Sequence, residues 1–470
     1  MSIVALFIAA ASIAAEPYIP YPWNITQSDG IELKAQLPEP GLTLTTKDPE
    51  RPKLWYAPVA SLTHNGKTSL WYQRVNSGEK EWIDQRTLCL GYIEDGQWSL
   101  PSLSPAPPVW GGPNNVVMTR SPHKPTWGGF NVFQMVQDDD RLHMLYWDQP
   151  SETGEAGAMI ATSTDNGLTW SKDPAGAVFT EHNDAYSLIK NNSGYTLYQT
   201  MLEDWPDKPY PDNLDKYKRV IALRTSSNLH AWTSQNVILR PDEKDPKETE
   251  FYLMKVFSYG EGLAGLIMKY YADPAMPKKH SAILKYELVL SKDGVAWERP
   301  FRDTDVGFWS YADPFFVGND VHFAMWKDGG MVTVKYRPNH LFGATASARG
   351  SLTTSTLTSD FAKATMAVSD PHAVKAITLL DADGHAIAHA KLKWSITNGE
   401  IETKVAGKIA RKGFQLKIDL ENGTLYNITP MVKSNHERAG HRTASAIRHV
   451  PGTQAPAGHH GGKKPRPSHP

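Results

Sequence analysis

The stretch Ser163-Thr164-Asp165-Asn166-Gly167-Leu168-Thr169-Trp170 has the composition of a tight hairpin turn with a hydrophobic anchor. Asp and Asn side chains hold a turn backbone, glycine supplies a positive φ, and the tryptophan can pack beneath the turn. Related stretches occur at 225–232 and 291–297, with a shorter one at 94–98. The closing tryptophans therefore recur every ~60 to 70 residues, a period that is typical of a repeat architecture.

Short strands repeat in a fixed order around these turns. Each unit of roughly 60 residues holds up to four runs with the pattern of antiparallel strands, separated by turn residues. The first strands of the units are predicted near 53–59, 130–135, 185–190, 251–257 and 312–317. This pattern predicts an all-β fold with a five-bladed β-propeller over residues 40–345. The fifth unit lacks a clear fourth strand, and we expect residues 42–45 to supply it.

The chain changes character after residue 342. Strands are predicted at 351–358, 365–368, 376–380, 388–394, 414–418 and 425–428, separated by turns at 381–384, 398–399 and 422–423. Residues 346–431 therefore predict a small β-sandwich that follows the propeller. Residues 432–470 are rich in Gly, Pro, His, Lys and Arg and contain almost no large apolar residue, so we predict a disordered basic tail.

Composition narrows the classes of function. The formal net charge of the 470-residue chain is −1, which gives no reason to expect nucleic-acid binding by the folded body. The single cysteine, Cys89, excludes an internal disulfide framework and is best interpreted as a small buried hydrophobe. Residues 3–15 are apolar and too short to span a bilayer, so we interpret 1–14 as a signal peptide, although it lacks a basic n-region. The predicted location is periplasmic or extracellular, with no membrane span, and the oligomeric state stays open.

Several motifs resemble known families. Ser163–Trp170 is similar to the Asp-box of sialidases, S-x-D-x-G-x-T-W, a structural motif of many propellers. The longer segments 224–232, 241–252 and 290–300 resemble the five-bladed β-propeller glycoside hydrolase superfamily, in particular proteins similar to the N-terminal domain of family 32. The resemblance covers roughly residues 50 to 430. It implies the fold and, more loosely, an activity on a carbohydrate substrate, because fold does not fix function.

Carboxylates open three of the five predicted innermost strands: Asp184, Glu250 and Asp313. Hydrolysis of a glycosidic bond needs a pair of carboxyl groups, one acid and one base or nucleophile. We assign Glu250 as the general acid because apolar neighbours would raise its pKa, Asp184 as the base or nucleophile, and Asp313 as a modulator. Asp313-Pro314 resembles the Asp-Pro of family 43, where it lies in the first blade. Asp184 and Asp313 are equally compatible with simple turn roles.

Aromatic and charged side chains near the same strand ends are candidate sugar contacts. The predicted substrate-binding residues are Trp127, Trp309, Tyr252, Trp55, Tyr56, Arg224 and His182. For Arg224 the alternative is an ion pair between blades, and for His182 a structural role. No sequence signature points to a cofactor or a metal ion.

The function predicted is an exported glycoside hydrolase that cleaves a polysaccharide or oligosaccharide. The alternatives are a non-catalytic carbohydrate-binding propeller and a sialidase-like hydrolase, against which the blade number argues. A carboxylate separation of about 5–5.5 Å would indicate a retaining enzyme, and about 6.5–9.5 Å an inverting one. We also expect Glu250→Gln to abolish hydrolysis and leave the fold intact.

Overall fold

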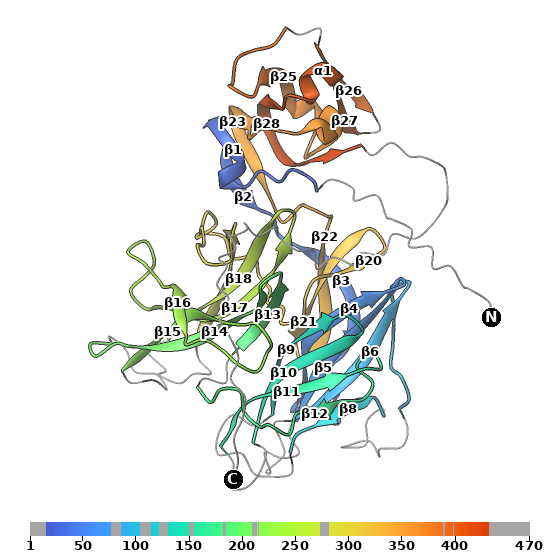
Figure 1. The fold of residues 1–470 in the computed structure, drawn as a ribbon, viewed down its shortest axis with the longest axis vertical. Helices are drawn as coiled ribbons and strands as arrows, with labels where there is room; N and C mark the ends of the chain where they lie inside the picture. Colours follow the sequence, from blue (N-terminus) through green and yellow to red (C-terminus); the bar gives the residue numbers. More distant parts are fainter. Residues whose placement is uncertain are drawn as a thin grey trace, which may run out of the picture.

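The computed structural model of the chain describes residues 16–76, 86–103, 114–121, 130–149, 155–181, 185–208, 214, 216–272, 282–388, 391–397 and 399–431. Five small antiparallel sheets are arranged as the blades of a ring, and a larger sheet lies beyond one side of it (Figure 1). The predicted five-bladed propeller followed by a β-sandwich is confirmed. The predicted signal peptide, residues 1–14, and the predicted tail, residues 432–470, lie outside the described residues.

Each blade runs outward from an innermost strand. Blade 1 is β4 (Leu54–His64), β5 (Lys67–Asn76), β6 (Arg86–Glu94) and β7 (Gln97–Ser99), with β8 (Val116–Thr119) also paired to β6. Blade 2 is β9 (Asn131–Asp138), β10 (Arg141–Asp148), β11 (Gly157–Ser163) and β12 (Ser171–Lys172). Blade 3 is β13 (Ala185–Asn191), β14 (Gly194–Asp204), β15 (Tyr217–Ser226) and β16 (Asn236–Leu239).

Blade 4 is β17 (Thr249–Tyr259), β18 (Gly262–Tyr271) and β19 (Ile283–Ser291), and its fourth position is an isolated bridge between Leu290 and Glu298. Blade 5 is β20 (Phe315–Val317), β21 (Asp320–Lys327) and β22 (Gly330–Tyr336), completed by β3 (Glu39–Thr45). The innermost strands contact one another around the ring: β4 with β9, β9 with β13, β13 with β17, and β20 with β4.

The ring is closed by the N-terminal segment. Strand β3 pairs antiparallel with β22, with Thr45 opposite Met331 and Thr43 opposite Val332 (Figure 1). The prediction that residues 42–45 supply the missing fourth strand is therefore confirmed. Leu44 is buried in the same apolar cluster as Leu70 of blade 1 and Phe315 of blade 5, so this strand also fills the core between the last blade and the first.

The Asp-box-like turn, residues 163–170, connects two blades. Within the turn, Ser163 Oγ accepts from Gly167 N (2.8 Å) and Asp165 Oδ1 accepts from Thr169 N (3.0 Å). The carbonyl of Gly167 accepts the indole N–H of Trp170 at 3.1 Å and that of Trp71 in blade 1 at 3.2 Å. Blade 4 repeats the device, because Gly294 O accepts from Trp297 and from Tyr198 of blade 3. Trp170 and Trp297 are thus scaffold residues, and their two turns each contact the preceding blade.

The larger sheet combines both ends of the described chain. Its order is β1-β23-β28-β24-β27-β26, and β2 pairs with β23 while β25 pairs with β28. The strands are β1 (Ile25–Asp29), β2 (Glu32–Ala35), β23 (Phe342–Thr354), β24 (Lys363–Val368), β25 (Val374–Asp381), β26 (Leu392–Thr397), β27 (Glu400–Val405) and β28 (Phe414–Pro430). Short helices are η1 (Pro22–Asn24), η5 (Ser359–Ala362), η6 (Pro371–Ala373) and α1 (Gly407–Ala410). Strand β23 runs through the predicted domain boundary at residue 345.

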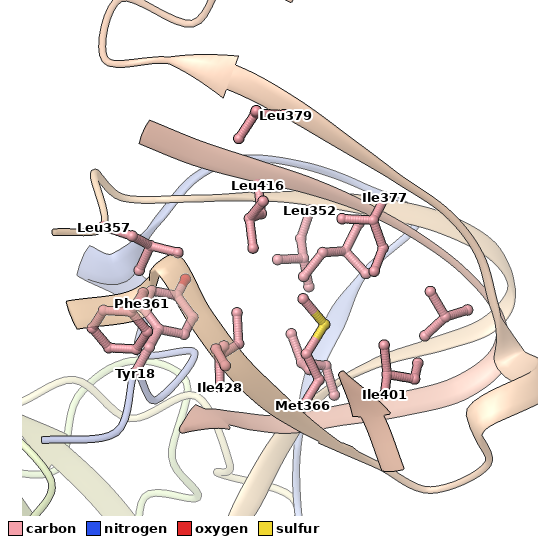
Figure 2. Packing of buried hydrophobic residues seen from close by; sticks show 14 of the residues in the cluster. Tyr18, Leu352, Leu357, Phe361, Met366, Ile377, Leu379, Ile401, Leu416 and Ile428 are labelled. Carbon is pink, nitrogen blue, oxygen red and sulfur yellow. The ribbon is translucent and has the colours of Figure 1, made fainter. Parts of the chain in front are cut away.

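The sandwich core is a separate apolar cluster. Figure 2 shows Tyr18, from the N-terminal segment, beside Phe361 and Leu357. The backbone of Tyr18 also bridges to Ile428, which fixes the N-terminal segment on the sandwich. The predicted turn at residues 422–423 is wrong: β28 passes through it without reversing, and Asn422, with φ 51°, lies at a bulge opposite β23.

Cys89 is a free, fully buried residue of blade 1, as predicted, and burial raises the pKa of its thiol. Within the described part of the chain, no helix has the length and apolarity needed to cross a bilayer.

Candidate functional site

The predicted carboxylates lie where the innermost strands begin, and two of the three are described. Glu250 is the second residue of β17, and Asp313 precedes β20 by two residues. Asp184, together with His182 and Trp127, lies outside the described residues, so these assignments stay predictions.

Glu250 is fully buried between blades 3 and 4. Its Oε2 accepts from the guanidinium of Arg219 at 2.7 Å and from the backbone N–H of Arg219 at 3.0 Å. Its Oε1 lies 2.9 Å from the ammonium of Lys208, and neither the Lys208 nor the Glu250 side chain is exposed to solvent. Besides its aromatic neighbours in sequence, the Glu250 carboxylate is therefore paired with two cations. These two cations hold the carboxylate in place through charge-assisted hydrogen bonds.

Tyr252 belongs to the same cluster of side chains. The Arg219 guanidinium lies 5.1 Å from the centroid of the Tyr252 ring and 4.5 Å from that of Tyr270. The two tyrosine rings contact each other edge to face at 6.0 Å. Glu250, Arg219 and Tyr252 thus form one unit, in which the carboxylate fixes the arginine and the arginine covers two aromatic faces.

Asp313 has a different environment. Its side chain is 38% exposed, and its Oδ1 lies 2.7 Å from the ammonium of Lys255, whose own side chain is 1% exposed. Burial lowers the pKa of Lys255, and the charge of Asp313 opposes that shift. The backbone carbonyl of Asp313 also accepts from Ser61 Oγ of blade 1 at 2.7 Å. A half-exposed carboxylate is therefore held in place from both neighbouring blades.

Sequence reasoning missed Lys255, although a signal was present. It is the one charged side chain in the otherwise apolar and aromatic run Phe251–Phe257 of β17. A lysine is almost never fully buried unless it has a partner, so a lone lysine in a buried strand predicts a carboxylate opposite it. Arg219 and Lys208 carried no comparable signal, because both lie in or beside a polar loop between β14 and β15.

The aromatic candidates differ in exposure. Trp309 is only 6% exposed and packs against Tyr286 and Tyr311, with ring centroids 6.3 and 5.7 Å away. Trp55 and Tyr56 are partly exposed on β4, and the Tyr56 ring packs against Tyr72. Tyr56 packs against the apolar cluster that contains Ala312, the neighbour of Asp313.

Arg224 lies away from this group. Its guanidinium pairs with Glu181, at 3.0 Å, in the segment between blades 2 and 3. An ion pair of this kind was the alternative to a sugar contact, and the assignment of Arg224 to the substrate stays a prediction. Arg224 and Arg219 are five residues apart on the regularly paired strand β15, so they project from opposite faces of blade 3.

Two of the segments that resemble the glycoside hydrolase superfamily bind each other. Arg299, in the segment 290–300, contacts Asp245, in the segment 241–252, and the fully buried Glu287 of β19. Lys269 pairs with Glu287 at 3.2 Å, and Arg302 pairs with Asp242. These residues form an ion network inside blade 4, so the motif residues that carried the resemblance are here structural.

One group of potential metal ligands occurs among the described residues, at Asp381, Asp383 and His385 in a turn of the sandwich, with ligand atoms within 4.8 Å of one another. Asp381 Oδ1 already accepts the backbone N–H groups of Asp383 and His385, which is the geometry of an ordinary turn.

Comparison with known proteins gives structural likeness only. No family model matches the chain, and no curated protein matches it. Similar solved structures include a family 117 glycoside hydrolase of the marine bacterium Zobellia galactanivorans, with 14% identity, a TM-score of 0.40, and coverage of 65% of this chain and 90% of that chain. A family 32 β-fructofuranosidase of Bombyx mori has 11% identity, a TM-score of 0.39, and coverage of 83% and 94%.

A third structure, described only as a glycoside hydrolase, has 10% identity, a TM-score of 0.41, and coverage of 65% and 92%. At these values the likeness carries no inference about activity, so the function has to be argued from this chain's own residues.

Proposed function

We propose that this protein is an exported glycoside hydrolase whose substrate binds where the innermost strands of blades 4 and 5 begin. The observation that carries the proposal is the contact between Asp313 and Lys255. The ammonium of Lys255 is buried and has lost its hydration, and its partner is a carboxylate that stays partly exposed to solvent. Charged side chains whose burial costs desolvation free energy are found more often at functional sites than elsewhere.

The proposed chemistry uses carboxyl groups on adjacent innermost strands. Of the two described candidate carboxylates, Asp313 is the one that is partly exposed to solvent; it is paired with Lys255 and serves as the charged group that faces the reacting centre. Asp184 keeps its predicted role as base or nucleophile. Glu250, predicted as the acid, is shielded from solvent by Lys208 and Arg219, and its surroundings favour a positioning role in which it holds Arg219 over Tyr252.

A second candidate function has an observation in its favour. Of the two described carboxylates, Glu250 is inaccessible and only Asp313 is open to a ligand. A single accessible carboxylate with aromatic neighbours suits a non-catalytic carbohydrate-binding propeller, because hydrolysis needs two carboxyl groups at the bond. A sialidase is disfavoured, since the ring has five blades and the Asp-box-like turns are scaffold contacts.

The test compares the wild type with Asp313→Asn on a panel of plant and algal polysaccharides. Released reducing sugar reports hydrolysis, and retardation in gels that contain each polysaccharide reports binding. The matched control is Asp320→Asn in blade 5, because Asp320 is also partly exposed and also paired with a lysine, Lys335.

The hydrolase would be supported if the wild type and Asp320→Asn both release sugar and Asp313→Asn releases it at least a hundredfold more slowly. Retardation without release of sugar would support the binding propeller. Neither hydrolysis nor retardation on any polysaccharide would overturn both.

A further inference from the structure

A groove lies between blades 2 and 3, on the face of blade 3 that carries Arg224. Its volume is about 540 Å³, within the ~300–1,000 Å³ that small-molecule sites occupy. Its walls come from the segment before β13 and from the turn after β15, and strands β14 and β15 supply its floor. The residues that line it include Phe179, Glu181, Arg224, Trp232, Thr233 and Gln235.

The groove is separate from the site at Asp313. Leu197, Gln199 and Met201 alternate along β14 on the face that Arg224 shares, since Arg224 is paired with Leu197. Arg219, which contacts Glu250, projects from the opposite face of the same strand. The sheet of blade 3 therefore stands between Arg224 and the Glu250 cluster.

Arg224 is held rigidly at the base of this groove. It is 5% exposed, and its guanidinium lies 4.7 Å from the centroid of the Phe179 ring. Its Nε donates to Gln199 Oε1 at 2.9 Å, and its Nη1 donates to the carbonyl of Thr233 at 3.2 Å. Three contacts thus fix the plane of the guanidinium before any ligand arrives, which lowers the entropy lost on binding.

The remaining nitrogen of Arg224 faces a carboxylate that can be replaced. Nη2 donates to Glu181 Oε2 at 3.0 Å, and the Glu181 side chain is 59% exposed. An ion pair with one exposed partner is weak because water screens it and the side chain loses entropy when held. Glu181 is therefore the exposed partner of the pair, whereas Arg224 is buried and held by Gln199 and Thr233.

Two buried amide groups accompany the arginine. Gln199 is 2% exposed, and its Nε2 has no hydrogen-bond partner among the described residues. Gln235, which lines the groove, likewise has a buried Nε2 without a partner in the described part of the chain. The Gln235 amide offers a hydrogen-bond donor at the wall of the groove, Gln199 supports Arg224 from behind, and Trp232 adds an aromatic surface against Phe179. Donors beside an aromatic surface suit a sugar ring that carries acceptor oxygens.

We propose that this groove binds an acidic saccharide, with the carboxylate of a uronic acid residue displacing Glu181 from Arg224. The planar guanidinium matches a carboxylate in geometry, and the Gln235 amide and Trp232 meet the ring and its hydroxyls. Glu181 occupies, in this structure, the position that the carboxylate of the ligand takes. The groove holds the acidic chain on one face of blade 3 while the region around Asp313 lies beyond the other.

The experiment measures binding of trigalacturonic acid and of the neutral cellotriose by calorimetry. All proteins in this experiment are the full chain with the substitution Asp313→Asn. This substitution prevents hydrolysis of the probe, so the binding result does not depend on whether the proposed hydrolase activity exists. Glu181→Gln is added to remove the competing charge, and Glu243→Gln, at an exposed position outside the groove, is the control for net charge.

Saturable binding of trigalacturonic acid, tightened roughly two- to fivefold by Glu181→Gln and unchanged by Glu243→Gln, supports the proposal. Gln235→Leu is expected to weaken it. No saturable binding, equal affinity for cellotriose, or an affinity that Glu181→Gln leaves unchanged would each overturn it. Circular dichroism spectra and melting curves of each variant confirm that differences in binding do not arise from unfolding.

Discussion

The guanidinium of Arg299 and the carboxylate of Asp245 form a two-pronged ion pair, with Nη1–Oδ2 at 2.5 Å and Nη2–Oδ1 at 2.7 Å. The arginine side chain is 2% exposed and the aspartate 4%. Arg299 also reaches Glu287 at 2.7 Å and lies over the ring of Phe251, the neighbour of Glu250. The segment before β17 is thereby tied to the outer edge of blade 4, next to the candidate site.

Arg299→Met should destabilise the protein by about 3–5 kcal/mol, because it leaves the carboxylates of Asp245 and Glu287 buried with less compensating charge. Arg302→Met is the matched control. Arg302 is 23% exposed and pairs mainly with the partly exposed Asp242, so we expect a loss of no more than about 1 kcal/mol. Urea unfolding followed by tryptophan fluorescence measures both. Equal losses in the two variants would contradict the importance of the buried pair.

Acid should weaken the same network. Burial alone would raise the pKa of Asp245, but hydrogen bonds from Arg299 outweigh it and the net pKa lies below the ordinary value of 3.8. A carboxyl group with a lowered pKa in the folded state contributes stability that is fully present above its unfolded pKa and is lost as pH falls through the folded pKa. The melting temperature of the wild type should therefore fall steeply below about pH 4.

Arg299→Met provides the comparison for this pH dependence. It should show a shallower decline than the wild type over the same range, because the pKa of Asp245 is then no longer held down by Arg299. Parallel declines in the two proteins would place the acid sensitivity elsewhere in the chain.

The Asp-box-like turn predicts a contrast between two glycines. Gly167 has φ +78°, and a Cβ there would lie 2.4 Å from the ring of Trp71 in blade 1. Gly176 has φ +87°, and a Cβ there would meet nothing within 4 Å. Both alanine variants carry backbone strain of roughly 1 kcal/mol, and Gly167→Ala should lose a further ~1–3 kcal/mol from overpacking. Equilibrium unfolding that ranks Gly176→Ala as the less stable variant would rule out the contact between blades as the cause.

A double-mutant cycle separates the contribution of the Lys255–Asp313 pair to stability from its contribution to activity. Asp313→Asn should lower stability, because it leaves a fully buried ammonium without its partner. Lys255→Met combined with Asp313→Asn should recover much of that stability, since no buried charge remains. Hydrolysis should stay lost in the double variant. Activity that returns together with stability would make Asp313 a structural residue.

The ion pairs of Glu250 mean that Glu250→Gln is expected to affect stability as well as activity. Sequence reasoning treated that substitution as silent for the fold, but the amide would leave Lys208 and Arg219 buried beside a neutral group. We now expect a loss of about 3–5 kcal/mol, so inactivity of this variant would not identify an acid. The assignment of Glu250 needs the stability of each variant measured beside its activity.

The parts of the fold that follow from local chemistry could be predicted. The turn at 163–170 and the spacing of tryptophans indicated five blades, because each turn depends on residues that are neighbours in sequence. Residues 422–423 show the limit of such reasoning: Asn-Gly favours positive φ, which serves a bulge inside a strand as well as a hairpin turn. The distinction depends on strand β23, far away in the chain.

The surroundings of the candidate site could not be predicted for the same reason. Glu250 is the neighbour of two aromatic residues in sequence, which indicated an apolar pocket, yet its side chain points toward Arg219 and Lys208 from another blade. The pairing of β1 and β2 with β23 was also missed. Contacts between distant segments leave no periodic signal in either partner.

Ring closure by β3 sets an order of events during synthesis. Thr45 is made about 290 residues before its partner Met331, and at ~5–20 residues per second β3 waits roughly 15 to 60 seconds for β22. Over that interval the segment offers unpaired backbone groups and the side chain of Leu44, which later fills the gap between the last blade and the first. A nascent chain of this protein can build blades 1 to 4 in sequence, but blade 5 is complete only when β3, made before all of these blades, pairs with β22.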